Sequence, residues 1–169
     1  AETTASGSYS TAMGFNTTAS GSYSTAMGAD TKASGYGSTA MGRGTTALGD
    51  FSTAMGSGTT ASDQSSVVIG QYNSSGSSEK TTTSAFSFSA SAPAFVIGNG
   101  TGSGTLSDAF VVDFSGNTTA GGDIFAGRDI LATGLVAATE FVGDGSQLTG
   151  ITTASIADGS VTSAKILDG

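Results

Sequence analysis

The chain has 169 residues, of which 27 are Gly and only 11% are charged, and its formal net charge is −8. This composition is typical of a fibrous chain rather than of an ordinary globular domain. The absence of His and Cys removes imidazole bases, thiol nucleophiles, disulfides and the usual zinc ligands. With only five basic residues, the sequence predicts no nucleic-acid binding, and we expect neither a cofactor nor a metal and no enzymatic activity.

The apolar runs of the chain are short. The run Ala94-Phe95-Val96-Ile97 is among the longest, and a membrane-spanning helix needs about 20 apolar residues. We therefore expect no direct membrane insertion by this chain and place any anchor or export signal outside it.

A 14-residue repeat occupies the first part of the chain. It reads Ser-Thr-Ala-Met-Gly in four copies and then degenerates to Ser-Val-Val-Ile-Gly and Ala-Phe-Val-Ile-Gly, the last ending at Gly98. A second half-repeat, such as Thr17-Thr-Ala-Ser-Gly21, separates the copies. The pattern predicts an all-β fold, a solenoid in which each coil contributes two short strands joined by tight turns. Glycines that supply unusual φ values are expected at the turns, namely Gly14, Gly28, Gly42, Gly56 and Gly70.

Strand alternation assigns the faces of each coil. Ala12 and Gly14 are expected to point one way, and Thr11 and Met13 the other. Because the Ala and Gly face is small in both half-repeats, two sheets can approach closely, and such a thin roll is poorly stabilised alone. A wider monomeric β-helix with the methionines inside is the alternative, and the uniformly small face argues against it.

Larger apolar side chains recur on the outward face. Burying one such side chain contributes roughly 1.5–3 kcal/mol, so we expect another copy of the chain to cover the row. A rotationally symmetric bundle meets this requirement. The predicted interface residues are Met13, Met27, Met41, Met55, Ile69 and Ile97.

The alternation of Ser-x-Ala-x-Gly with Thr-x-Ala-x-Gly resembles the head repeat of YadA-like trimeric autotransporter adhesins. The resemblance is close over residues 1–70 and extends more weakly to residue 98. It implies a left-handed parallel β-roll assembled as a homotrimer on a cell surface. The same head repeat also occurs in bacteriophage tail fibres and other surface fibres, so a virion location stays open. Met replaces the usual Val or Ile of the family at the face assigned to the trimer axis, which makes that packing more pliant.

The repeat becomes irregular in residues 71–98, which are rich in Ser and contain Tyr72, Phe86 and Phe88. One interpretation is a decorated coil or a protruding loop. The alternative is a receptor-contact loop, because exposed aromatic side chains on loops often bind partners. The three aromatic residues are the candidate contacts.

A different rhythm begins in the region 99–150. Phe110, Val112 and Phe114 alternate as in a strand, before a turn at Ser115-Gly116-Asn117. Six-residue blocks then follow, and we interpret them as an intertwined, triple-stranded β-stalk to which three chains contribute. Its interface residues are predicted to be Ile124, Ile130, Val136 and Val142.

The segments 109–117 and 141–151 resemble parts of tail-fibre and tailspike proteins. In those families they often precede an autocleaving chaperone domain, and we expect the natural chain to continue beyond residue 169. A final stalk segment is assigned to 151–169, and the tail-fibre-like region as a whole to 109–169.

The predicted function is that of a structural and adhesive part of a trimeric extracellular fibre. Its partners would be further copies of itself and a cell-surface glycan or protein receptor. A polysaccharide-degrading tailspike and an ice-binding solenoid are the alternatives.

Overall fold

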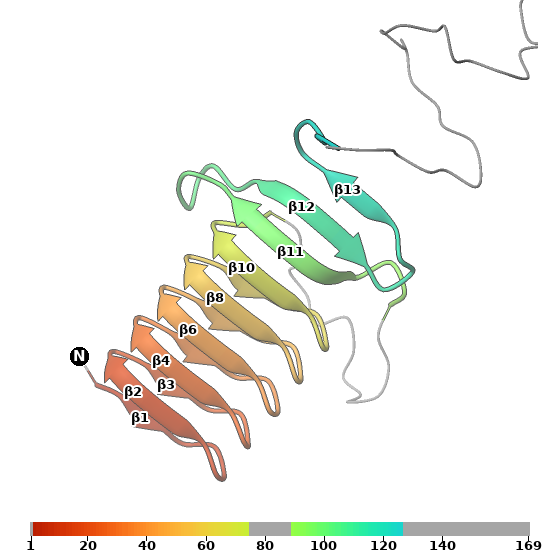
Figure 1. Ribbon diagram of the computed structural model, residues 1–169. Helices are drawn as coiled ribbons and strands as arrows, with labels where there is room; N and C mark the ends of the chain where they lie inside the picture. The colour runs from red at the N-terminus through yellow and green to blue at the C-terminus, as the bar shows by residue number, and fades with distance from the viewer. Residues whose placement is uncertain (1, 75–88, 127–169) are drawn as a thin grey trace, which may run out of the picture. The chain divides into compact units, whose positions relative to one another are not determined.

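The computed structural model describes residues 2–74 and 89–126 (Figure 1). All regular elements in these residues are β-strands, and all of them lie in one compact unit, Ala1–Phe125. The predicted residues Phe86, Phe88, Ile130, Val136 and Val142 lie outside the described part of the chain.

The first ten strands alternate between two lengths, and each coil contributes one strand of each. The short strands are β1 (Thr4–Ala5), β3 (Thr18–Ala19), β5 (Lys32–Ala33), β7 (Thr46–Ala47) and β9 (Thr60–Ala61). The long strands are β2 (Thr11–Phe15), β4 (Thr25–Ala29), β6 (Thr39–Arg43), β8 (Thr53–Ser57) and β10 (Val67–Gln71). They are followed by β11 (Pro93–Asn99), β12 (Asp108–Asp113) and β13 (Thr118–Ala120).

These strands form two sheets. The short strands make a five-stranded sheet in the order β1-β3-β5-β7-β9. The other sheet has eight strands in the order β2-β4-β6-β8-β10-β11-β12-β13, and its pairs are parallel as far as β11 and antiparallel beyond it. Neighbouring strands pair in strict repeat register, for example Met13 with Met27. The fold is therefore the predicted β-solenoid of parallel coils.

Alanine fills the space between the two sheets. The alanines of both half-repeats are fully buried from the second coil to the fifth: Ala19, Ala26, Ala33, Ala40, Ala47, Ala54 and Ala61. The inward direction predicted for them is confirmed. Beyond β9, where the short-strand sheet ends, the larger Val68 and Val96 take over the interior, and Val111 packs against them. The buried side chains are thus small where the two sheets face each other and larger where the short-strand sheet has ended.

The glycines predicted at turns lie inside strands instead. Gly42 belongs to β6, has φ +123° and is exposed, so it does not share the buried face of Ala40. The equivalent glycines of the other coils have φ between +95° and +123°. The strand continues through these glycines, but the alternation of side-chain directions assumes negative φ and fails there. A Cβ on Gly42 would collide with the carbonyl oxygen of Gly56 on the next coil.

The side chain of a serine closes the longer turn in four of the first five coils; the exception is Ser24, whose Oγ has no hydrogen-bond partner. The Oγ of Ser38 donates a hydrogen bond of 2.8 Å to the carbonyl oxygen of Gly35, and the backbone N of Ser38 donates to the same atom. Ser10, Ser52 and Ser66 repeat the side-chain bond at 2.7 Å. At the opposite turn, Thr45 is fully buried and its Oγ1 has no hydrogen-bond partner.

The irregular region 71–98 is long enough for two 14-residue coils, but it adds only one strand, β11, to the eight-stranded sheet. β11 pairs directly with β10, with Val67 opposite Phe95, so the intervening sequence is an insertion between neighbouring rungs. Asn73 ends the short-strand sheet just before this insertion. Its side-chain amide accepts a hydrogen bond from the N of Thr60 at 2.8 Å and donates one to the O of Thr60 at 3.0 Å. It thereby takes the place of a further strand.

The strand predicted around Phe110 exists, but it belongs to the solenoid and not to a stalk. β12 pairs with β11, with Phe110 opposite Ile97, and β13 follows after a tight turn. In that turn the side chain of Asn117 donates to Asp113 at 2.7 Å. This bond, helped by backbone donors, lowers the pKa of Asp113. Ile124 follows the last strand and is 71% exposed.

The strand glycines give a first test of this packing. Gly42→Ala should lower the free energy of unfolding by more than about 1 kcal/mol, because alanine is strained at positive φ and its Cβ meets the backbone of the next coil. Gly104→Ala is the control, since a Cβ there meets nothing within 4 Å. Thermal unfolding followed by circular dichroism measures both, and equal melting temperatures would contradict the close approach.

Two buried hydroxyls give a second test. Ser38→Ala should destabilise the protein by about 1 kcal/mol, because it removes a satisfied hydrogen bond. Thr45→Val keeps the shape of the side chain and removes a buried hydroxyl that has no partner, so it should stabilise by up to about 1 kcal/mol. Denaturant titration of the two variants should give shifts of opposite sign. Loss of stability in both would show that Thr45 has a partner in solution.

Candidate functional site

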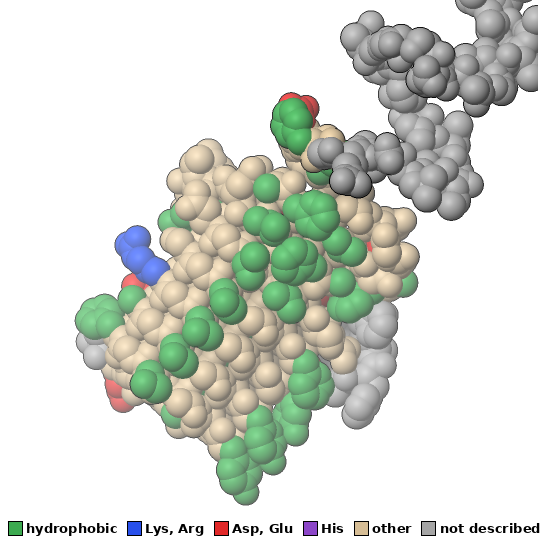
Figure 2. Space-filling view, in the orientation of Figure 1, with side chains coloured by type: hydrophobic (Ala, Val, Ile, Leu, Met, Phe, Trp, Pro, Cys, Tyr) green, Lys and Arg blue, Asp and Glu red, His purple; other side chains and the backbone are tan. Residues whose placement is uncertain are grey.

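A row of apolar side chains crosses the outer face of the eight-stranded sheet. Strand pairing brings its members into one line from coil to coil (Figure 2). Met13 is 56% and Met55 is 39% exposed, and the other members are half-buried. We call this row the methionine ladder; it comprises Met13, Met27, Met41, Met55, Ile69 and Ile97. It is the row predicted from the repeat.

The ladder widens at its C-terminal end. Phe110 lies opposite Ile97 and prolongs the row, while Phe95 pairs with Val67 on one side and with Val112 on the other. The rings of Phe95 and Phe110 meet edge to face with centroids 6.4 Å apart. None of these side chains is fully buried. An apolar patch therefore continues the methionine ladder over the last strands of the sheet.

A second row was missed by the sequence analysis. We call it the aromatic ladder; it comprises Tyr9, Tyr23, Tyr36 and Phe51. Successive ring centroids are 5.1, 5.4 and 5.4 Å apart, and each residue is at least 45% exposed. Tyr9 and Tyr23 stack face to face, whereas the next two pairs, Tyr23 with Tyr36 and Tyr36 with Phe51, meet edge to face. Figure 2 shows apolar side chains gathered in two separate rows on this face.

The aromatic ladder is continuous although its ring stands one residue earlier in the third coil. Tyr9, Tyr23 and Phe51 occupy one turn position with φ +58°. The third coil has Gly37 at that position, with φ +59°, and carries its ring one residue earlier on Tyr36. The ring of Phe51 fills the space that a side chain on Gly37 would need. The 14-residue spacing of Tyr9 and Tyr23 is the signal that could have revealed the row.

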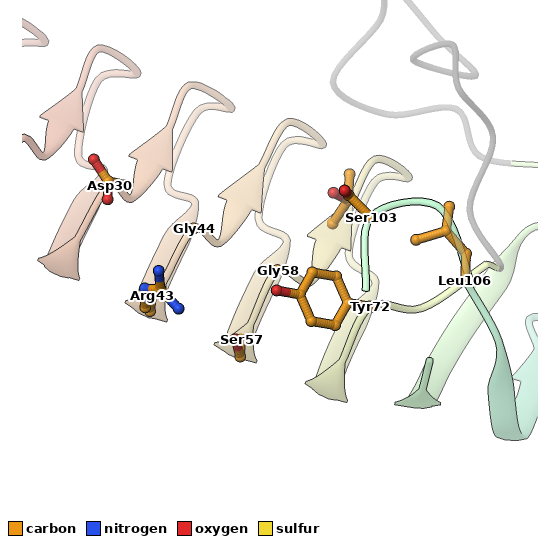
Figure 3. A pocket seen from close by; sticks show the side chains of 9 residues that line it. Asp30, Arg43, Gly44, Ser57, Gly58, Tyr72, Ser103 and Leu106 are labelled. Carbon is orange, nitrogen blue, oxygen red and sulfur yellow. The ribbon is translucent and has the colours of Figure 1, made fainter. Parts of the chain in front are cut away.

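A groove of about 380 Å³ lies at the shorter turns (Figure 3). Its residues come from the ends of the long strands, from the turns that follow them, from the start of β9 and from the loop between β11 and β12. They are Asp30, Arg43, Gly44, Ser57, Gly58, Thr60, Tyr72, Ser103 and Leu106.

Two glycines open the groove. In the first coils the turn position holds Asn16 and Asp30, and the Nδ2 of Asn16 donates to Oδ1 of Asp30 at 2.7 Å. In the next two coils the same position is Gly44 and Gly58, with φ of +63° and +61°. The missing side chains leave a trough, and the ring of Tyr72 lies against Gly58 at one end of it.

The loop that completes the groove is tied to the last coil. The N of Ser107 donates to the O of Tyr72 at 3.0 Å, and the N of Gly100 donates to the O of Gln71 at 3.1 Å. The hydroxyls of Thr101 and Thr105 are 2.7 Å apart and close the loop. Ser103 and Leu106 are thereby held beside Tyr72, one of the three predicted receptor contacts.

Within the described residues, no three or more Asp, Glu, His or Cys side chains gather where they could hold a metal ion. The same part of the chain contains no helix of the length and apolarity that crossing a membrane requires. The surface features on which a function can be built are thus the two ladders and the groove.

The architecture described above is that of a repeat-built β-solenoid with 14-residue coils. The family model of the YadA head domain repeat matches residues 5–31, 33–59 and 49–73. No curated protein and no solved structure matches the chain. The coils of residues 5–73 are thus similar to the YadA head domain repeat, and such repeats are typical of trimeric autotransporter adhesins. The tail-fibre-like character of 109–169 stays a prediction.

The aromatic ladder predicts an order of stability among single variants. An aromatic pair contributes about 0.5–1.5 kcal/mol beyond its burial. The ring of Tyr23 contacts two neighbouring rings and that of Tyr9 contacts one, so Tyr23→Ala should lower the free energy of unfolding more than Tyr9→Ala. Chemical denaturation of both variants measures the difference. Equal losses would show that the ring contacts contribute nothing to stability.

Proposed function

We propose that this chain is a structural and adhesive segment of a homotrimeric extracellular fibre. Three copies would cover one another's methionine ladders and present their remaining surfaces to a cell or host receptor. The fibre would be either a bacterial surface adhesin or a virion tail fibre. The YadA head repeats in residues 5–73 support this proposal.

The observation that carries the proposal is the inversion of side-chain size between the inside and the outside of the coils. The buried apolar side chains of the regular coils are alanines, while the larger Met and Ile side chains stand in one line on the outer face. An in-register apolar row of this length favours association or aggregation in water unless another surface covers it. The same row is available on every copy, so identical chains can bury it around one axis.

The opposite outer face has a different character. The short-strand sheet presents Thr18, Lys32, Thr46 and Thr60 in register, and Lys32 is exposed to solvent. Such a face is suited to water. One apolar and one polar outer face are what each subunit of a trimer around a central axis requires.

Adhesion would follow from repetition. A trimer displays three copies of each surface, and linked sites raise the effective affinity for a surface that carries many receptors. The proposed interface continues through Ile124 and through the six-residue positions Ile130, Val136 and Val142 of the predicted stalk. The proposed targets are cell-surface glycans or proteins.

A double substitution tests the assembly. Met27→Asp with Met41→Asp would bury charges along the trimer axis, which is strongly unfavourable. The particle of three times 16.3 kDa should therefore give way to single chains or to an aggregate. Thr18→Asp, on the opposite face, is the control and should leave the trimer intact. Light scattering coupled to size-exclusion chromatography measures the mass. Attachment to cells should be lost with the trimer and kept in the control.

The proposed face would be wrong if the two kinds of substitution had equal effects on mass. Trimers that attach to no cell type would contradict the adhesive role but not the proposed homotrimeric assembly.

A further inference from the structure

We propose that the groove between Arg43 and Tyr72 is a binding subsite for a saccharide that carries a carboxylate group. This inference rests on the proposed adhesive function and assigns residues and a ligand class to it. The groove lies on described residues of the solenoid and of the loop between β11 and β12.

The groove has the size of a ligand site. Its volume of about 380 Å³ falls in the range of small-molecule pockets, roughly 300–1,000 Å³. Arg43 ends β6 and Tyr72 follows β10, so two strand spacings, about 10 Å, separate their positions along the solenoid. This length suits a short stretch of sugar rings better than a single small ion.

Arg43 supplies the charge. It is exposed, and its guanidinium forms no ion pair or hydrogen bond with any described residue, while the neighbouring Asp30 already accepts a bond from Asn16. A free guanidinium binds a carboxylate in a bidentate manner. Lys32 and Arg43 are the only cations among the described residues, and the chain carries a net charge of −8. A polyanion would therefore be repelled much more strongly than an oligosaccharide that carries one carboxylate.

Tyr72 and the hydroxyl groups supply the remaining contacts. The ring of Tyr72 lies over the turn at Gly58 and is only partly buried (Figure 3). An aromatic ring offers an apolar surface with a polar tip, which matches a sugar ring with its C–H face and hydroxyl rim. Ser57, Thr60 and Ser103 also line the groove, and each hydroxyl can both donate and accept.

The backbone of the groove argues against a peptide ligand. Peptides that add to a sheet need free backbone donors and acceptors along an edge. Here the N of Gly44 donates to the O of Ala29 and the N of Gly58 donates to the O of Arg43, both at 2.8 Å. The floor is therefore already paired, and recognition falls to the side chains around it.

Two variants test the subsite without threatening the fold. Gly44→Asn fills the trough: Asn16 holds the same turn position with φ +53°, and a Cβ on Gly44 meets nothing nearer than 3.9 Å. Arg43→Gln removes the charge. Lys32→Gln is the matched control, because it removes the other described cation from a different face.

The probes are oligosaccharides ending in glucuronic acid or sialic acid, each compared with its neutral counterpart. They are tested against the full chain by calorimetry and on a glycan array. We expect the wild type to prefer an acidic probe, Arg43→Gln and Gly44→Asn each to weaken its binding by about tenfold or more, and Lys32→Gln to bind like the wild type.

Two results would overturn the inference: groove variants that bind the acidic probes as tightly as the wild type, or a fibre that attaches to cells and binds none of these saccharides. In both cases the proposed adhesive function stands. The particle mass, measured in parallel, tests the homotrimeric fibre independently of the saccharide subsite. Groove-dependent saccharide binding by a particle that is not a trimer would uphold the inference and contradict the proposed function.

Discussion

The width of an alanine side chain sets the distance between the two sheets, and the rest of the structure depends on that constraint. A methyl group from each half-repeat fills the interior of a regular coil, as Ala26 and Ala33 do in successive strands. Such a coil buries little apolar surface, so most of its order comes from the backbone hydrogen bonds and side-chain rows that join it to the next coil. The glycine column belongs to the same constraint, because a Cβ on Gly42 would collide with the coil above.

A narrow interior places the bulky side chains outside. The methionine ladder and the aromatic ladder both stand on the surface, and they are stabilised in different ways. The rings of the aromatic ladder contact one another within a single chain, one pair stacked and two pairs edge to face. The methionines lie in register with their counterparts in neighbouring coils, and we propose that another copy of the chain covers their outer side. The proposed binding groove lies where the repeat departs from its rule, at Gly44 and Gly58.

Much of this could be predicted from the sequence because a strict repeat fixes register. Once Met13 and Met27 occupy equivalent positions, the ladder follows, and alternation places Ala26 inside. Alternation failed at Gly14 because the rule assumes negative φ. The aromatic ladder was hidden by the one-residue shift of Tyr36. The pairing of β12 with β11 depends on a match between distant segments that no local pattern encodes. The groove could not be predicted because it combines two turns that carry glycine, at Gly44 and Gly58, with a loop from a distant part of the chain.

Peroxide oxidation of the native particle, read by mass spectrometry, tests the central claim that another copy covers the methionine ladder. All four methionines of the chain belong to this ladder, and a thioether that solvent can reach is readily converted to the sulfoxide. The account predicts that Met27 and Met41, in the middle of the ladder, resist oxidation in the native particle and react once it is unfolded. Oxidation of both at the rate of the unfolded chain, with the solenoid intact, would contradict it.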